Sequence, residues 1–295
     1  MLRLASRHAR ACLIVGLLAG LALPGLAAAL AGWLPQMVAA LLTITALRIG
    51  HRAALGAVRD LIWGLASVLA LQTLLPLLLG GFVLVGLGQT PAALAVTLAA
   101  AAPALTGSVN LALLMRLDAG RMMQLMVLGT AAFPLTVLPV LAALPQLGPA
   151  SEIALAALRL LAVILGATGL GFALRHVFLP QPTPRQTEAL DGASVLAFSV
   201  IVVGLMAALN PALRSDPWAV ACWTLLAFAL SYLLQAGTLL LTRRGPLRAV
   251  AGPLAIGAGN RNIALFLVAL PAEVIAPLMI FIGCWQLPMY LTPVL

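Results

Sequence analysis

Two stretches of the sequence decide the fold: Pro103-Ala104-Leu105-Thr106-Gly107-Ser108-Val109-Asn110 and Gly252-Pro253-Leu254-Ala255-Ile256-Gly257-Ala258-Gly259-Asn260-Arg261-Asn262. Each places glycine, proline and polar residues inside an apolar run that is long enough to cross a bilayer. A membrane helix interrupted at its centre exposes backbone groups that lipid cannot satisfy, so the break must line a cavity or face protein. Paired interruptions in the two halves of a chain indicate the substrate site of a transporter.

The composition is that of a polytopic membrane protein. Of 295 residues, 63% are hydrophobic and 8% are charged, whereas about a quarter of a soluble domain is charged. All sixteen basic residues are arginine and lie in small groups between apolar spans. This pattern favours the lipid bilayer, not nucleic acid, as the partner. Cys12, Cys222 and Cys284 lie far apart in apolar segments, so we expect packing residues and neither a metal nor a cofactor.

Charges and turn residues divide the sequence into ten apolar spans, and most approach the roughly 20 residues that cross a bilayer. The spans cover residues 11–31, 34–48, 60–84, 91–115, 121–144, 152–174, 192–210, 217–241, 247–270 and 273–294. The first is longer than the roughly 7–15 apolar residues of a signal peptide, so we expect a membrane helix. The sequence therefore predicts an all-α membrane protein with ten transmembrane helices.

The connections between the spans alternate in charge. One side carries Arg3, Arg7, Arg10, Arg48, Arg52, Arg59, Arg116, Arg121, Arg175, Arg185, Arg243, Arg244 and Arg248, and the other side carries Arg214. Because positively charged loops stay inside, the N-terminus and the C-terminus are both predicted to be cytoplasmic. We expect an integral protein of the plasma (inner) membrane, with the connection over residues 179–191 in the cytoplasm.

The ten spans divide into five and five, which gives repeats over residues 1–148 and 149–295. Because five is odd, the second copy must enter the membrane the other way up, so the repeats are inverted. The broken span is the fourth of each half. Helices 4 and 9 therefore approach from opposite sides, and their breaks are predicted to meet near the midplane.

The breaks carry the candidate substrate-binding residues. Ser108 or Asn110 is expected to cap a new half-helix, and Asn260 or Asn262 a second one. The positive ends of two half-helices favour an anion. The expected binding set is Thr106, Gly107, Ser108, Asn110, Gly259, Asn260 and Asn262. The alternative is that glycine and proline only kink packed helices.

Arg261 stands out because an arginine at the centre of a span costs roughly 2.5–3.5 kcal/mol on insertion scales and should face a cavity or a partner. All seven acidic residues fall in loops or at span ends, namely Asp60, Asp118, Glu152, Glu188, Asp191, Asp216 and Glu273. The expected partners are freed carbonyls, side-chain amides or a bound anion. Arg261 is then either linked to substrate, a replacement for a cation, or a structural donor to carbonyls. Arg159, about two turns into its span, is expected to snorkel.

Gln72, Gln124 and Thr130 complete the candidate set as polar side chains within spans. Each is either part of an ion site or an ordinary hydrogen bond between membrane helices, which is worth about 0.6 kcal/mol.

At this point the chain resembles the bile acid:sodium symporter family over nearly its whole length. The likeness is carried by Leu71-Gln72 ahead of Pro76, by the stretch from Pro103 to Asn110, and by Gly259-Asn260-Arg261-Asn262-Ile263-Ala264-Leu265. The resemblance implies a core of helices 3–5 and 8–10 that moves against a panel of helices 1, 2, 6 and 7, with substrate between them. It implies that Asn110 and Asn262 are the crossing asparagines and that Gln72 contributes to a sodium site.

The chain departs from the family pattern at the ion site. Gly257 stands where the family has a glutamate, Arg261 where it has a glutamine, and Val109 where it has a serine. Met123 and Val127 replace hydroxyl-bearing positions of helix 5. Hard cations prefer oxygen ligands, often with a carboxylate among them. These departures disfavour Na⁺ coupling and predict that the Arg261 guanidinium takes the place of a sodium ion near the helix 3 amide.

The predicted function is secondary active transport of an organic anion, bile-acid-like or a small carboxylate, by alternating access. The alternatives are a sodium-independent facilitator, proton-linked transport, and a transporter-like sensor that binds without moving substrate. The arsenite exporters share the general architecture, but no cysteine lies near the helix 4 break. A channel would use rings of charge or carbonyls. An enzyme is not expected, because acids, histidines and cysteines are missing near the breaks.

Overall fold

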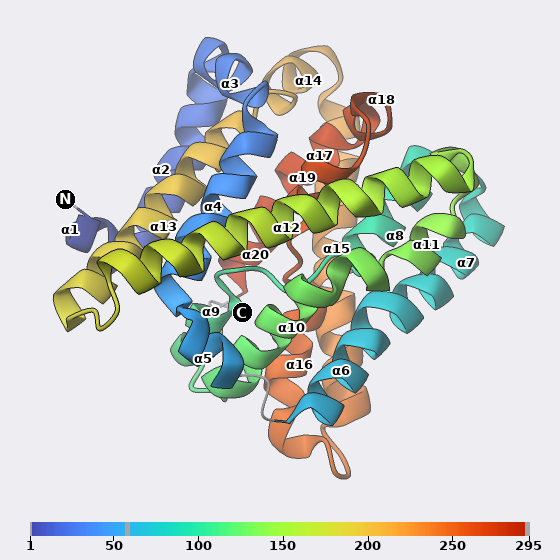
Figure 1. Ribbon diagram of the computed structural model, residues 1–295. Helices are drawn as coiled ribbons and strands as arrows, with labels where there is room; N and C mark the ends of the chain where they lie inside the picture. Colours follow the sequence, from blue (N-terminus) through green and yellow to red (C-terminus); the bar gives the residue numbers. More distant parts are fainter. Residues whose placement is uncertain (1, 57–59, 293–295) are drawn as a thin grey trace. The chain divides into compact units, whose positions relative to one another are not determined.

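The computed structural model of the chain describes residues 2–56 and 60–292, and all of its named elements are helical (Figure 1). The first half contains α1 (Leu2–Arg7), α2 (Ala9–Ala22), α3 (Pro24–Ala31), α4 (Leu34–Ile49), α5 (His51–Gly56), α6 (Leu61–Leu69), the π-helical turn η1 (Ala70–Leu74), α7 (Leu75–Leu87), α8 (Pro91–Ala101), α9 (Ser108–Leu114), α10 (Ala119–Thr136), α11 (Leu138–Ala142) and η2 (Pro145–Leu147). The second contains α12 (Ala150–Phe178), α13 (Pro184–Leu205), α14 (Leu209–Ser215), α15 (Pro217–Thr242), η3 (Arg248–Val250), α16 (Ala251–Gly259), η4 (Ile263–Leu265), α17 (Phe266–Ala269), α18 (Ala272–Ile275), η5 (Ala276–Leu278), α19 (Met279–Cys284) and α20 (Gln286–Leu291). Arg59 lies outside the described residues.

The helices confirm an all-α integral membrane protein. Within the described residues, six helical segments are long and apolar enough to cross a bilayer. They cover Leu61–Leu87, Ala119–Ala142, Ala150–Phe178, Pro184–Ser215, Pro217–Thr242 and Ala272–Leu291. The bent pair of α2 and α3 makes a seventh if it is counted as one span, and α4 and α8 are shorter apolar helices.

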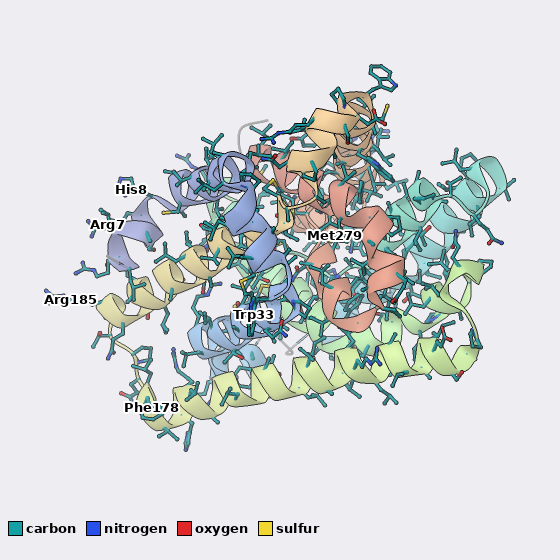
Figure 2. All side chains as sticks on the ribbon, turned by 90° about the horizontal axis from the view of Figure 1, so that it is seen from above. Arg7, His8, Trp33, Phe178, Arg185 and Met279 are labelled. Carbon is teal, nitrogen blue, oxygen red and sulfur yellow. The ribbon has the colours of Figure 1, made fainter. Side chains whose placement is uncertain are left out.

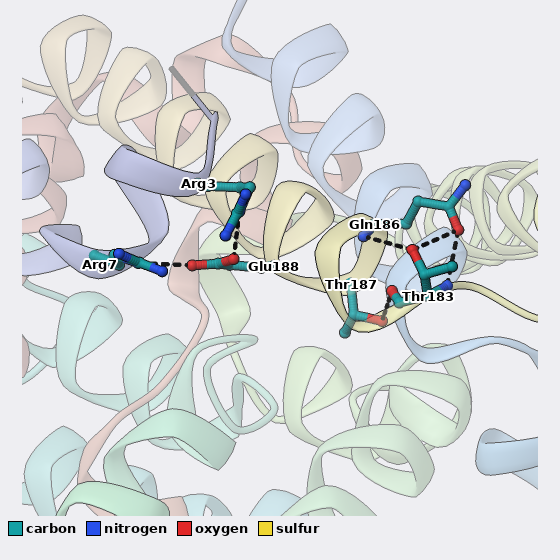
Figure 3. Close-up of polar contacts among 6 residues, drawn as sticks. All are labelled: Arg3, Arg7, Thr183, Gln186, Thr187 and Glu188. Atoms are coloured by element: carbon teal, nitrogen blue, oxygen red, sulfur yellow. Dashed lines mark hydrogen bonds and ion pairs between the residues drawn. The ribbon is translucent and has the colours of Figure 1, made fainter.

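Two predicted spans have a different form in the structure. The first is a pair of helices bent by 103° at Leu23, because Pro24 cannot continue the hydrogen bonding of α2. The seventh begins earlier than predicted: most of the connection over residues 179–191 belongs to α13, which starts at Pro184. A capping box of Thr183 and Gln186 fixes this start, since each side chain bonds the backbone N–H of the other (Figure 3).

The chain forms two compact units. The first unit comprises residues 1–53, 162–223 and 279–286. In it, α13 packs along α1, α2, α3 and α4. Arg3 and Arg7 of α1 both pair with Glu188 of α13, at 2.5 and 2.8 Å (Figure 3). Asn210 of α14 donates a hydrogen bond to the carbonyl of Leu21, next to the bend between α2 and α3.

The second unit comprises residues 54–161, 224–278 and 287–295. In it, α6 and α9 pack on α10, α7 packs on α8, and α16 contacts both α9 and α10. The helix α8 is buried over almost its whole length, although it is rich in alanine, so other helices surround it closely. Both interrupted stretches of the sequence belong to this unit.

Candidate functional site

The two interrupted stretches meet through their backbones. The N–H of Leu105 donates to the carbonyl of Asn260, and the N–H of Asn262 donates to the carbonyl of Pro103, both at 2.8 Å. Ala104 and Arg261 thus form an isolated antiparallel β-bridge between the break after α8 and the break after α16. We call residues 102–106 and 258–262 the break site. Each break satisfies backbone groups of the other, as an interruption inside a membrane requires.

The Arg261 side chain is 1% exposed and collects carbonyl oxygens from three segments. Its Nε donates to Ala258 at 2.7 Å, its Nη1 to Ala102 at 2.9 Å, and its Nη2 to Leu71 at 3.0 Å. These acceptors belong to α16, to the end of α8 and to η1, respectively. The guanidinium therefore joins the break site to the helix of Gln72, through the backbone of the preceding residue.

The carbonyl of Leu71 is available because of the π-helical turn. In an α-helix it would accept from Leu75, but the Leu75 N–H donates to Ala70 instead. The next candidate donor is Pro76, which has no N–H. A π-turn followed by proline thus leaves one main-chain oxygen in the middle of a span for the guanidinium.

The breaks free the other two carbonyls. Ala102 leaves the helical conformation, with ψ of 148°, so its carbonyl no longer points to the N–H of Thr106. The helical donor to Ala258 would be Asn262, but that N–H donates to Pro103. Arg261 satisfies both oxygens in place of the helical donors. These three hydrogen bonds match one of the roles expected for Arg261 from the sequence, that of a structural donor to backbone carbonyls.

Side chains also join the two breaks. Asn262 is 8% exposed, and its Nδ2 lies 3.4 Å from the Thr106 hydroxyl, to which it donates. Thr106 and Gly107 are half-buried, and Asn110 is exposed in the first turn of α9. The Ser108 hydroxyl is fully buried and donates to the carbonyl of Leu105 at 2.6 Å.

The expected side-chain caps are absent. Gly107 is the N-cap of α9 and Asn262 the N-cap of η4, and neither end carries a side-chain cap bond. The Ser108 hydroxyl donates to the carbonyl of Leu105, and the Asn262 amide donates to the Thr106 hydroxyl. Neither side chain accepts from a helix N-terminus. The absence of side-chain caps leaves the first backbone N–H groups of α9 and η4 without side-chain acceptors, and the binding of an anion at these helix ends stays a prediction.

Asn260 points away from the contact between the breaks. Its Oδ1 accepts from the Thr292 hydroxyl at 3.1 Å, and its Nδ2 donates to Ile256. On the same side, Ser231 of α15 donates to the carbonyl of Gly259 at 2.9 Å, and Gln235 donates to both Ser231 and Thr292. Ser231, Gln235 and Thr292 were not predicted from the sequence as site residues. Ser231 and Gln235 are polar residues one helical turn apart within an apolar span, a spacing that placed them on one face.

Gln72 lies beside the break site and bonds to α10. The Thr136 hydroxyl donates to its Oε1 at 3.0 Å, and both residues are buried. Thr130 is half-buried on α10. Gln124 lies elsewhere: it donates to the carbonyl of Asp60 at 2.7 Å and accepts from Arg121, so the structure places it at the start of α6.

Gly257 faces apolar side chains. A Cβ at this position would lie 3.5 Å from Met122, 3.6 Å from Leu125 and 3.9 Å from Ala104. A carboxylate there would be desolvated without a polar neighbour among these atoms. The nearest surroundings of residue 257 are thus apolar.

No family model matches the chain, and no curated protein matches it.

Proposed function

We propose that the chain is a secondary transporter of a small organic anion, related to the bile acid:sodium symporters, which works by alternating access. In this proposal ten spans form two inverted repeats in the plasma (inner) membrane, with both termini cytoplasmic. The observation that carries the proposal is the break site. Two interrupted helices from opposite halves of the chain satisfy each other's backbone groups, and such paired interruptions are typical of transporter substrate sites.

Pairs of polar residues in each half support the repeat. In the first half Gln72 bonds to Thr136, from the third span to the fifth. In the second half Gln235 bonds to Thr292, from the eighth span to the tenth. Each pair connects the two helices that flank the broken helix of its own half. A glutamine and a threonine at corresponding places are expected if the halves are copies of one fold.

A fixed positive charge favours an anionic substrate. Arg261 is buried at the break site, while all seven acidic residues are in loops or near the ends of spans. In a low-dielectric interior a guanidinium attracts an anion more strongly than it would in water. The apolar surroundings suit a bile-acid-like molecule or a small carboxylate.

Sodium is not needed in this mechanism. The three carbonyl oxygens that bind Arg261 are freed by helix breaks and a π-turn, and such oxygens coordinate cations in other transporters. Here they already hold a cation that is part of the chain. The three atoms nearest to a Cβ at residue 257 are apolar and would supply no ligand for a cation. We therefore propose sodium-independent transport, either facilitated or proton-linked.

Uptake into proteoliposomes tests the proposal. The full chain is reconstituted, and radiolabelled taurocholate and a panel of short carboxylates are supplied with an inward sodium gradient or with choline in its place. We expect saturable uptake at the same rate with the sodium gradient and with choline. Asn262→Ala removes the bond to Thr106 and should lower uptake, while Arg243→Gln, on the exposed turn after α15, should not.

Three results would contradict parts of the proposal. Stimulation of uptake by sodium would refute the cation-replacing role of Arg261. Ligand-induced thermal stabilisation without flux would identify a sensor. If no anion of the panel binds or is transported, and a neutral or cationic solute is transported instead, the proposed substrate class is refuted.

A further inference from the structure

Arg175, in the last turn of α12, closes the end of α4. Its Nη1 donates to the carbonyl oxygens of Leu47 and Arg48, at 3.1 and 3.4 Å. Both are among the carbonyls that a helix end leaves without an internal partner. Gly50, with φ of 75°, then turns the chain into α5. The start of α5 is thereby held against the end of α12.

Two imidazole rings meet at this turn. The ring centroids of His51 and His176 are 6.0 Å apart in an edge-to-face arrangement, and Arg52 beside them is exposed. None of these three side chains forms a hydrogen bond or ion pair with another residue in the described part of the chain. The two acids near the start of α13 are already paired, Asp191 with Arg48 at 3.1 Å and Glu188 with Arg3 and Arg7. The turn therefore carries a surplus of positive charge and N–H donors that are available to an anion.

The length of α12 places this cluster among lipid headgroups. Its 29 residues span about 44 Å at a rise of about 1.5 Å per residue, while the hydrocarbon core is about 30 Å thick. The helix is longer than the core, and because its last turn carries Arg175 and His176 we place this end in the headgroup layer. Val177 and Phe178 at this end are 67% and 72% exposed, and Figure 2 shows Phe178 at the tip of the helix. Donors for a phosphate thus lie next to side chains that suit acyl chains.

We propose that His51, Arg52 and His176 form a binding site for the phosphate of an anionic phospholipid, which we call the headgroup site. Basic groups between membrane helices near the headgroup layer bind such lipids because charge attraction and hydrogen bonding act together with burial of the acyl chains. The helix end closed by Arg175 keeps the three donors in place. The lipid binds across α5 and α12 and holds these two segments together.

Thermal unfolding of the full chain in detergent micelles tests the headgroup site. Phosphatidylglycerol or phosphatidylcholine is added to the wild type, to the triple variant His51→Gln/Arg52→Gln/His176→Gln, and to the control variant Arg243→Gln/Arg244→Gln. The control removes two exposed arginines at the end of α15. We expect phosphatidylglycerol to raise the Tm of the wild type and the control above the value in phosphatidylcholine. The triple variant should lose at least half of this rise.

An equal rise in the triple variant would overturn the proposal. A rise of the same size with inorganic phosphate or glycerol phosphate would overturn the lipid assignment, because a soluble anion would then suffice. If the triple variant is already unfolded in phosphatidylcholine, Arg52→Gln alone decides the matter, since this exposed side chain has no described partner to lose. Arg52→Gln should show a smaller rise in Tm with phosphatidylglycerol than the wild type, and an equal rise would count against the headgroup site.

Discussion

Replacing Arg261 with methionine should destabilise the protein strongly. The variant leaves the carbonyls of Ala102, Ala258 and Leu71 without the donors that now bind them at 2.7–3.0 Å. A buried acceptor that loses its donor costs about 1–3 kcal/mol, so the loss is about 3–9 kcal/mol before compensation. Removing a buried charge returns several kcal/mol of desolvation free energy. The two terms oppose each other, and because three neutral acceptors lose their donors the expected net cost is about 2–5 kcal/mol.

The measurement is thermal unfolding in detergent, where the cost should appear as a Tm lowered by on the order of 10 °C. Arg159→Met is the matched control, because Arg159 is exposed on α12 and the same substitution there should change stability by no more than about 0.5 kcal/mol. Arg261→Lys should restore part of the loss, since an ammonium keeps the charge but lacks the planar fork that reaches three segments. The reasoning is refuted if Arg261→Met unfolds within 2 °C of the wild type, or if the control loses as much.

Three further predictions concern residues around the break site and the start of α6. Gly259→Ala should destabilise the protein by about 1–3 kcal/mol, because the added Cβ would lie 2.2 Å from Gln235 Cγ. Gly237→Ala should not destabilise it, because no atom lies within 4 Å of a Cβ there, and thermal unfolding of the two variants tests this. Gln72→Leu and Thr136→Val should show coupling of about 0.5–3 kcal/mol in a double-mutant cycle, and additive effects would count against their bond. The hydrogen bond from the Arg121 guanidinium holds the pKa of Asp60 below its usual range. The ionised Asp60 carboxylate therefore contributes to stability at neutral pH, and this contribution is lost on acidification. The stability difference between wild type and Asp60→Asn should therefore shrink below about pH 4, and a difference that persists there would contradict the pairing.

The breaks were predictable because Pro103 and the asparagine-rich segment after Gly259 cannot continue a membrane helix without other partners. Their backbone pairing follows the same physics, since each break needs donors and acceptors that lipid does not provide. The direction of single side chains was not predictable. Asn260 and Asn262 are two residues apart, yet the unwound backbone turns one toward Thr292 and the other toward Thr106.

Other features depend on tertiary contacts that leave little trace in local sequence. Gln124 resembles Gln72 as a polar residue in an apolar span, but it lies close to the start of its helix and bonds to Asp60. The π-turn at Leu71 arises where Pro76 and the guanidinium of Arg261 act on the same carbonyl. The 103° bend at Pro24 was hidden because its flanks read as one continuous apolar run.

The three hydrogen bonds of Arg261 also limit how the protein can move. A guanidinium is planar and rigid, so the backbone at residues 71, 102 and 258 can separate only if charged hydrogen bonds break in a dry interior. The helical segments that carry or adjoin these residues, η1, α8 and α16, therefore move as one rigid piece. If the protein transports by alternating access as proposed, distances between spin labels on these three segments should stay constant during the cycle, and the moving boundary must lie elsewhere in the molecule.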